Sequence, residues 1–110
     1  GYLYGHIDYK RKTIYILNQF TPSDSKGKKT SFRHGTSGVK DYRNNLSKRT
    51  INQVEYIGDW HSHPVSSLEM SEKDISTSEN DVLPELRRGI GICVITNAHD
   101  TKFYLIANNK

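Results

Sequence analysis

The chain has 110 residues, 34% of them hydrophobic and 25% charged, which is enough to build a globular domain around a single core. We therefore expect residues 1–110 to form a single domain. No stretch approaches the ~20 consecutive apolar residues that a transmembrane helix needs, so we expect no membrane partner. The net charge of +4 comes from scattered basic residues, without the dense stripe interleaved with aromatics that nucleic-acid binding usually shows. We therefore expect no nucleic acid partner.

Cys93 is the only cysteine, so the chain cannot form an internal disulfide bond. Small secreted domains are often held together by disulfides, and no export signal opens the sequence. We therefore expect a cytoplasmic protein. Cys93 lies within the apolar run 89–95, which predicts a buried core residue and not a catalytic nucleophile.

Alternating side chains predict a β-hairpin at the start of the sequence. Residues 2–9 alternate between two faces, and residues 13–17 are β-branched or aromatic. Both patterns are typical of strands, and the turn that joins them falls at residues 9–12. The polar segment 21–27 predicts a surface loop, and residues 31–33 predict a short strand.

Apolar residues at roughly helical spacing predict a helix from residue 39 to residue 53. We expect the polar, solvent-exposed side of this helix to carry four basic residues: Lys40, Arg43, Lys48 and Arg49. The next segment, 54–61, predicts a strand. It should end before Pro64, because proline removes a backbone donor and stops a strand.

The second half of the sequence predicts a helix followed by two strands. Ser71 and Asp74 match a Ser-x-x-Asp capping box, so a helix should begin there and continue loosely to Leu86. Residues 89–96 form a nearly continuous apolar run, typical of a strand buried on both faces, and residues 101–107 form the last strand. The order hairpin, helix, strand, helix, hairpin predicts an α/β fold with a mixed β-sheet flanked by helices.

Two histidines and one aspartate are spaced as ligands of one metal ion. His61 and His63 are two residues apart in a predicted strand, so they point to the same side a little under ~7 Å apart. If Ser71 begins a helix, Asp74 lies one turn in and close to the same side. Two histidines, one aspartate and a water form the open tetrahedral site of a catalytic zinc ion. Such an ion lowers the pKa of its bound water toward ~7.

Each part of this pattern also has a purely structural interpretation. A His-x-His pair on a strand is more often structural or exposed than metal-binding, and Ser71 with Asp74 alone would be a helix cap. Trp60 alternates with His61, so it should point away from the metal and pack in the core. Asp59 shares the face of the histidines, where we expect a supporting or solvent-exposed role. Three further histidines stand alone and predict surface or loop positions: His6, His34 and His99.

The complete pattern His-x-His-x7-Ser-x2-Asp, from His61 to Asp74, resembles the JAMM (MPN-plus) metalloprotease motif without a mismatch. The run Gly-Asp-Trp-His-Ser-His-Pro at 58–64 is similar to the corresponding run of prokaryotic JAB-domain proteins. Gly-Tyr-Leu-Tyr-Gly at 1–5 resembles their Gly-x-Leu-x-Gly strand. The resemblance covers nearly the whole chain and implies a fold like that of the cytidine deaminases. Deaminase activity is excluded, because His-x-Glu and Pro-Cys-x-x-Cys are both absent.

The resemblance implies zinc-dependent hydrolysis of isopeptide bonds to ubiquitin, or of peptide bonds after ubiquitin-like proteins. His61, His63 and Asp74 would bind one zinc ion, and Ser71 would donate a hydrogen bond to the tetrahedral intermediate. The expected partner is a ubiquitin-like protein or its conjugate. Two alternatives stay open: a catalytically silent MPN-like module that binds a protein, and a JAMM peptidase that cuts cell-wall peptides or a conjugated immune enzyme.

The family's general base is a glutamate just ahead of the Gly-x-Leu-x-Gly strand. That strand begins at Gly1, so no residue of the sequence matches the glutamate. We expect the segment that bears it to be missing, and the 110-residue chain alone to be inactive or nearly so. Glu69, in the loop between the ligands, is the least unsuitable substitute.

Overall fold

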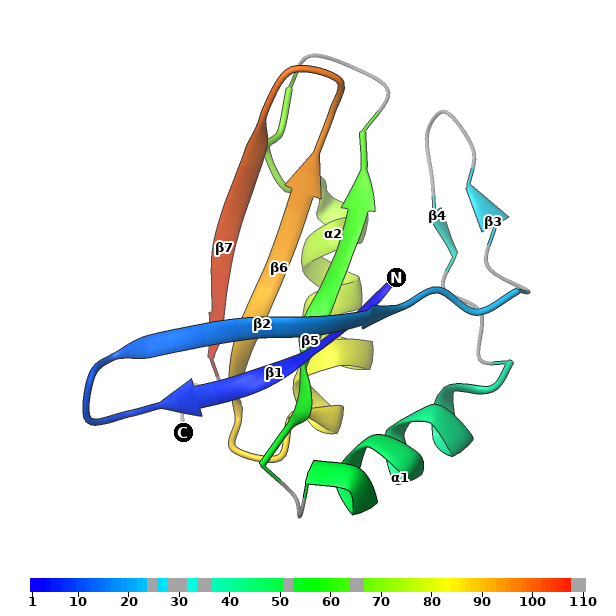
Figure 1. Cartoon of the computed structure of the whole chain (residues 1–110). Helices are drawn as coiled ribbons and strands as arrows, with labels where there is room; N and C mark the ends of the chain where they lie inside the picture. The colour runs from blue at the N-terminus through cyan, green and yellow to red at the C-terminus, as the bar shows by residue number, and fades with distance from the viewer. Residues whose placement is uncertain (24–25, 28–31, 34–36, 51–52, 64–66, 108–110) are drawn as a thin grey trace.

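The computed structural model describes residues 1–23, 26–27, 32–33, 37–50, 53–63 and 67–107. Its centre is a mixed five-stranded sheet in the order β2-β1-β5-β6-β7 (Figure 1). β5 and β6 are parallel, and the other neighbouring strands are antiparallel. The five strands are β1 (Tyr2–Asp8), β2 (Thr13–Phe20), β5 (Glu55–Ser62), β6 (Ile90–Thr96) and β7 (Thr101–Ala107). The expected α/β class with a mixed sheet is confirmed.

Both predicted hairpins are present. In the turn between β1 and β2, the Lys12 N–H donates to the Tyr9 carbonyl at 3.3 Å. In the turn between β6 and β7, Asn97 Oδ1 accepts from the N–H groups of His99 at 2.8 Å and Asp100 at 2.9 Å. An asparagine side chain commonly closes a turn in this way. β1 pairs with β5 over Tyr2–Gly5, and the β1–β2 hairpin lies at a steep angle to β6 and β7 (Figure 1).

The helices also follow the sequence closely. α1 (Val39–Thr50) is the predicted first helix. Residues 51–52 of that prediction lie outside the described residues, and its last residue, Gln53, is not helical. α2 (Glu72–Thr77) continues as one π-helical turn (Ser78–Val82) and one 3-10 turn (Leu83–Glu85), which is the loose helix expected after Ser71. None of the described helices has the length and apolar composition needed to cross a bilayer.

A separate two-stranded ribbon precedes α1. It pairs β3 (Lys26–Gly27) with β4 (Phe32–Arg33) in antiparallel orientation. The short strand expected at 31–33 is therefore present at its last two residues, while Ser31 lies outside the described residues. The prediction that 21–27 is all loop was wrong at its end, because the last two residues pair with β4.

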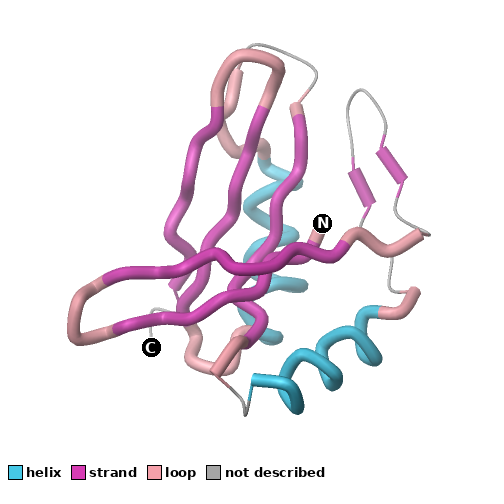
Figure 2. Tube along the Cα trace, in the orientation of Figure 1, coloured by secondary structure: helices cyan, strands magenta, loops and turns pink. Residues whose placement is uncertain are grey.

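Two apolar clusters lie on opposite faces of the sheet, since successive residues of a strand point to opposite sides. On one face, Tyr4 and Tyr56 of the sheet pack with Leu46 of α1 and with Val82 after α2. Both helices therefore cover this face (Figure 2). The cluster on the other face contains no helical residue; its buried members are Leu3, Ile7, Ile57, Ile92 and Val94. Cys93 is 2% exposed and belongs to the helix-covered cluster, so the prediction of a core cysteine is confirmed.

Arg43 is a correction to the expected polar side of α1. Its guanidinium carbon lies 4.7 Å from the centre of the Tyr56 ring, and its Nη1 lies 3.4 Å from Glu85 Oε2. A planar guanidinium stacks well on an aromatic face, and the ring of Tyr56 lies directly beneath α1. Arg43 therefore joins α1 to the core, whereas Lys40, Lys48 and Arg49 are exposed as expected.

Gly58 permits the close approach of the central strands. A Cβ at this position would overlap the Ile92 carbonyl oxygen of β6, and the φ of Gly58 is +143°, which favours glycine. The register of β5 against β1 also shifts here, so that Leu3 faces Gly58 and Tyr4 faces Tyr56. Such a bulge re-aims the side chains that follow it. The histidines of β5 begin three residues later.

Candidate metal centre

His61 near the end of β5, His63 directly after that strand and Asp74 in the first turn of α2 converge on one point. His61 Nε2 lies 3.0 Å from Asp74 Oδ1 and 3.1 Å from His63 Nε2. His63 Nε2 lies 3.2 Å from Asp74 Oδ2. The three ligand atoms form a group that could hold a metal ion. The side chains are 10–17% exposed, so the cluster lies just beneath the surface.

His63 is held from two sides. Its backbone N–H donates to the Thr96 carbonyl at 2.8 Å and extends the pairing of β5 with β6 by one residue. Its ring Nδ1 lies 3.2 Å from the Ser67 carbonyl oxygen. Because a carbonyl only accepts, Nδ1 carries the proton in this contact, which leaves Nε2 as the ring nitrogen that a metal ion would bind. This is the tautomer that a metal ligand requires.

Ser71 and Asp74 form the capping box expected from the sequence. Ser71 Oγ accepts from the Asp74 N–H at 3.1 Å, and Asp74 Oδ2 accepts from the Ser71 N–H at 2.9 Å. The bond from the Ser71 N–H fixes the Asp74 carboxylate, so that Oδ1 faces His61. The bond from the Asp74 N–H uses a lone pair of the Ser71 hydroxyl and leaves the hydroxyl proton for another acceptor.

The carboxyl group of Asp74 is held in its ionised form. Burial alone would raise the pKa of Asp74, but hydrogen bonds from Ser71 and the nearby imidazoles of His61 and His63 outweigh burial and lower it. A carboxyl group must be deprotonated to bind a metal. The hydrogen bonds of the cap therefore favour the form of Asp74 that can bind one.

The atoms of the cluster fit a small tetrahedral cation. Around an ion with bonds of about 2.0–2.1 Å, two ligand atoms lie about 3.3 Å apart. The separations of 3.0–3.2 Å measured between the three side chains are close to that value.

Two acidic residues near the cluster do not belong to it. Glu69 Oε1 lies 2.7 Å from Lys102 Nζ, which lowers the pKa of Glu69, and the side chain is exposed. Asp59 is 3% exposed and buried in β5 beside Cys93 of β6. Of its two expected roles, the solvent-exposed one is therefore wrong and the supporting one stays a prediction. Burial, with Asp59 as the next contribution, raises the pKa of the Cys93 thiol to about 12.

The two isolated histidines that the structure describes do not belong to the metal cluster. His6 lies on β1, where its ring stacks on Tyr15 with centroids 6.5 Å apart and its Nδ1 lies 3.1 Å from the Gln53 carbonyl. His99 is exposed in the last turn, as expected. His34 lies outside the described residues.

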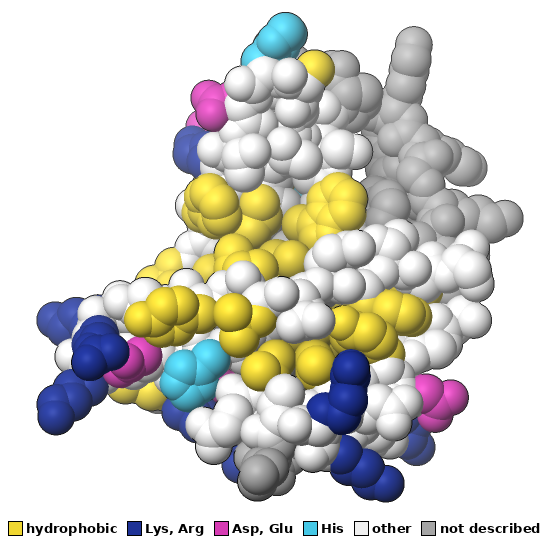
Figure 3. Space-filling model, in the orientation of Figure 1, with side chains coloured by type: hydrophobic (Ala, Val, Ile, Leu, Met, Phe, Trp, Pro, Cys, Tyr) yellow, Lys and Arg dark blue, Asp and Glu magenta, His cyan; other side chains and the backbone are white. Residues whose placement is uncertain are grey.

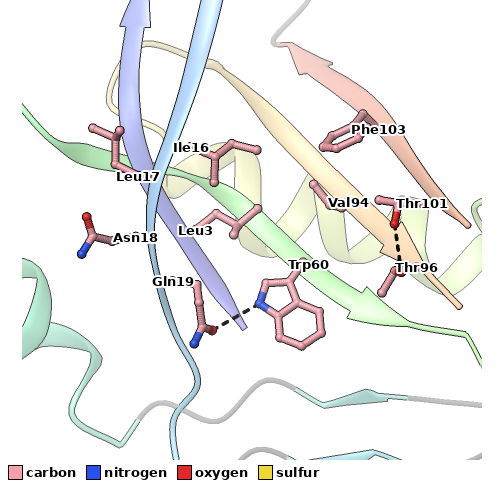
Figure 4. A pocket seen from close by; sticks show the side chains of 10 residues that line it. All are labelled: Leu3, Ile16, Leu17, Asn18, Gln19, Trp60, Val94, Thr96, Thr101 and Phe103. Carbon is pink, nitrogen blue, oxygen red and sulfur yellow. Dashed lines mark hydrogen bonds between the residues drawn. The ribbon is translucent and has the colours of Figure 1, made fainter. Parts of the chain in front are cut away.

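Trp60 points to the opposite face of the sheet, as its alternation with His61 predicts. There it lines an open groove of about 430 Å³, and its Nε1 lies 3.4 Å from Gln19 Oε1 (Figure 4). Apolar side chains gather on this face (Figure 3). Trp60 also packs against the core cluster of this face, but it is only half-buried at the groove wall. The groove contains none of the ligand residues.

One group of contacts near the ligands was not apparent from the sequence. Tyr104 on β7 donates from its hydroxyl to the Leu68 carbonyl at 2.8 Å. The two residues are 36 positions apart, and no local pattern connects them. The one available signal is that the polar residues Lys102 and Tyr104 alternate with apolar ones and so share a face of the strand.

Comparisons with known proteins agree with this arrangement. A family model for prokaryotic homologs of the JAB domain matches residues 1–107. The chain is also 33% identical over 75 residues to a protein of Enterobacter hormaechei subsp. hoffmannii (strain UCI 50) named CD-NTase/cGAS isopeptidase. That alignment covers 67% of this chain and 40% of the relative, so the matched part spans less than half of the relative's length. With a family match over nearly all of its residues, the chain belongs to the prokaryotic homologues of the JAB domain.

Proposed function

We propose that this chain is a zinc-dependent isopeptidase or peptidase domain that cuts the bond joining a ubiquitin-like protein to its target. The observation that carries the proposal is the convergence of His61, His63 and Asp74 on one point near the surface. Membership of the JAB family and the isopeptidase name of the relative support a hydrolytic role. We take residues 1–110 as one domain, and the single cysteine favours the cytoplasm.

The three ligands would hold the ion through His61 Nε2, His63 Nε2 and the Asp74 carboxylate. Two imidazoles and one carboxylate are a ligand set of catalytic zinc sites, in which the fourth position remains open. When bound, zinc polarises the scissile carbonyl and lowers the pKa of a water molecule toward ~7. The three side chains are 10–17% exposed, so a substrate tail would approach them from the surface.

Ser71 would stabilise the negative charge that develops on the substrate oxygen. Its hydroxyl is fixed beside the ligand Asp74, because it accepts from the Asp74 N–H at 3.1 Å. The hydroxyl proton can then be donated to the oxygen of the tetrahedral intermediate. A single donor of this kind contributes about 10²–10³ in rate in comparable sites.

Hydrolysis also needs a group that takes the proton of the water and passes it to the leaving amine. The cluster contains no glutamate among the described residues. Glu69 is held by Lys102 and is exposed, which disfavours it as a substitute. We therefore assign this role to none of the carboxylates in the described residues.

The substrate class rests on the printed name of the relative. A protein named CD-NTase/cGAS isopeptidase favours a substrate in which a CD-NTase or cGAS-type protein is joined through an isopeptide bond. The conjugated immune enzyme, one of the alternatives open at the outset, is therefore preferred over a cell-wall peptide. A silent binding module is disfavoured, because a scaffold does not require three converging ligands.

The proposal is tested by incubating the longest natural form of the protein with a ubiquitin-like protein joined to a lysine side chain. The zinc-loaded protein should release the two products. The His61→Ala/His63→Ala double variant should release no products, and neither should protein from which a chelator has removed the zinc. A linear fusion of the same two partners distinguishes isopeptidase from peptidase specificity. Cleavage that persists in the double variant would overturn the proposal.

A further inference from the structure

The loop between the metal ligands is fastened at each of its described positions. The Ser67 carbonyl faces His63 Nδ1 at 3.2 Å, and Ser67 Oγ accepts from the Glu69 N–H at 3.3 Å. The side chains of Leu68 and Met70 pack against the helix-covered core cluster. This segment lies beside β7, as the light-green trace before α2 shows (Figure 1).

β7 contacts the loop through two side chains of one face. Tyr104 donates to the Leu68 carbonyl at 2.8 Å, and Lys102 Nζ lies 2.7 Å from Glu69 Oε1. Residues two apart in a strand point to the same side, and Lys102 Nζ also lies 5.2 Å from the centre of the Tyr104 ring. Both contacts could therefore hold the loop in place.

The two contacts differ in burial, and this decides which of them matters. The Tyr104 ring packs on the core cluster and its hydrogen bond is partly buried. The Lys102 and Glu69 side chains are 45% and 73% exposed, so water competes for both. Exposed ion pairs contribute little, whereas a partly buried carbonyl that loses its donor must find another partner or move.

We propose that Tyr104 is a positioning residue for the metal ligand His63, an inference that rests on the proposed metal centre. The route is short: the Tyr104 hydroxyl fixes the Leu68 carbonyl, and the adjacent Ser67 carbonyl thereby stays within reach of His63 Nδ1. The contact between the Ser67 carbonyl and His63 Nδ1 sets both the tautomer and the orientation of the His63 ring. Partners of a ligating histidine typically contribute 10–100-fold to metal affinity.

The test is the zinc dissociation constant of Tyr104→Phe, measured by competition with a coloured chelator. Phenylalanine keeps the ring in the core and removes only the donor. We expect about tenfold weaker zinc binding, the low end of the range for such partners, because Tyr104 acts through one intervening residue. Lys102→Met is the matched control on the same face of β7, and its affinity should equal that of the unaltered chain. All are measured at a temperature where circular dichroism shows them folded without zinc.

A double-variant comparison separates positioning of His63 from general support of the fold. In a His63→Ala background, Tyr104→Phe should no longer change zinc affinity, because the side chain it positions is gone. In a His61→Ala background the weakening should remain. If Tyr104 only supported the fold, Tyr104→Phe would lower thermal stability in every background. It would then weaken zinc binding equally in the His61→Ala and His63→Ala backgrounds.

The outcomes distinguish this inference from the proposed function. If the unaltered chain binds zinc and Tyr104→Phe binds it equally well, the inference is wrong while the metal centre stands. Equal weakening in the His61→Ala and His63→Ala backgrounds also overturns it. If the unaltered chain binds no zinc, the metal centre itself is wrong, and the role of Tyr104 falls with it.

Discussion

Ser71 and Asp74 exchange two hydrogen bonds, one in each direction, at 2.9 Å and 3.1 Å. One member of this pair is a proposed metal ligand and the other a proposed oxyanion donor. The start of α2 therefore serves as a helix cap and as part of the site at once. A cap alone and a cap with a catalytic hydroxyl predict different results when Ser71 is changed.

In the longest natural form of the protein, we expect Ser71→Ala to retain zinc and to slow turnover. A hydroxyl that acts mainly in the transition state affects kcat more than KM, and we expect a loss of about 10²–10³ in kcat. Loss of the cap should also lower the free energy of unfolding by about 1 kcal/mol. The measurement is steady-state kinetics at a temperature where both forms are folded. Ser76→Ala, an exposed serine of α2, is the control; an unchanged kcat in Ser71→Ala would leave Ser71 as a cap only.

In the longest natural form of the protein, Glu69→Gln should leave turnover essentially unchanged. The carboxylate is exposed and paired with Lys102, so it is poorly placed to take a proton from water at the cluster. A general base is worth about 10²–10⁴-fold, so a loss of that size would be unmistakable. If Glu69→Gln shows such a loss in kcat, Glu69 is the base, and its exclusion from that role is wrong.

Gly58→Ala should be strongly destabilising. The new Cβ would overlap the Ile92 carbonyl between two central strands, and the backbone would be held at a φ that alanine disfavours. We expect a loss of about 2 kcal/mol or more in the free energy of unfolding, measured by urea denaturation. Gly38→Ala provides the comparison, because Gly38 also has a positive φ but is exposed and meets only the edge of the Phe20 ring. Equal losses at both positions would show that close strand contact adds nothing to the backbone strain.

Cys93 should react slowly with thiol reagents in the folded chain. Burial raises the pKa of its thiol to about 12, so almost no thiolate forms at pH 8, and the group is also inaccessible. Unfolding restores an ordinary pKa near ~8.5, so stability should fall as the pH rises above that value, where the unfolded thiol loses its proton first. Titration with a chromogenic disulfide at pH 8, with and without denaturant, measures the difference. Rapid reaction of the folded chain would contradict a core position.

Local patterns account for what could be predicted from the sequence. The strand 90–96 is continuous and apolar, and the Ser71–Asp74 cap is complete within four residues, so both could be assigned without tertiary information. The convergence of His61 and His63 follows from the two-residue period of a strand. The approach of Asp74 to the two histidines could be predicted because the strand was expected to end before Pro64 and the helix to begin at Ser71.

Contacts between distant segments could not be predicted in this way. Arg43 stacks on Tyr56 and pairs with Glu85, which is 42 positions away, although helical spacing alone places it on the polar side. Tyr104 reaches Leu68 only because β7 lies beside the loop that carries it. Both depend on how the sheet and its helices pack, which no short window of sequence contains.

The most direct test of the central claim is the zinc content of the purified chain, measured by elemental analysis beside a His61→Ala/His63→Ala double variant. If His61, His63 and Asp74 form the metal centre, the unaltered chain should contain about one zinc ion. The double variant should contain almost none and should melt at a lower temperature than the zinc-bound chain, since bound metal stabilises the folded state. Full retention of zinc by the double variant would contradict the account.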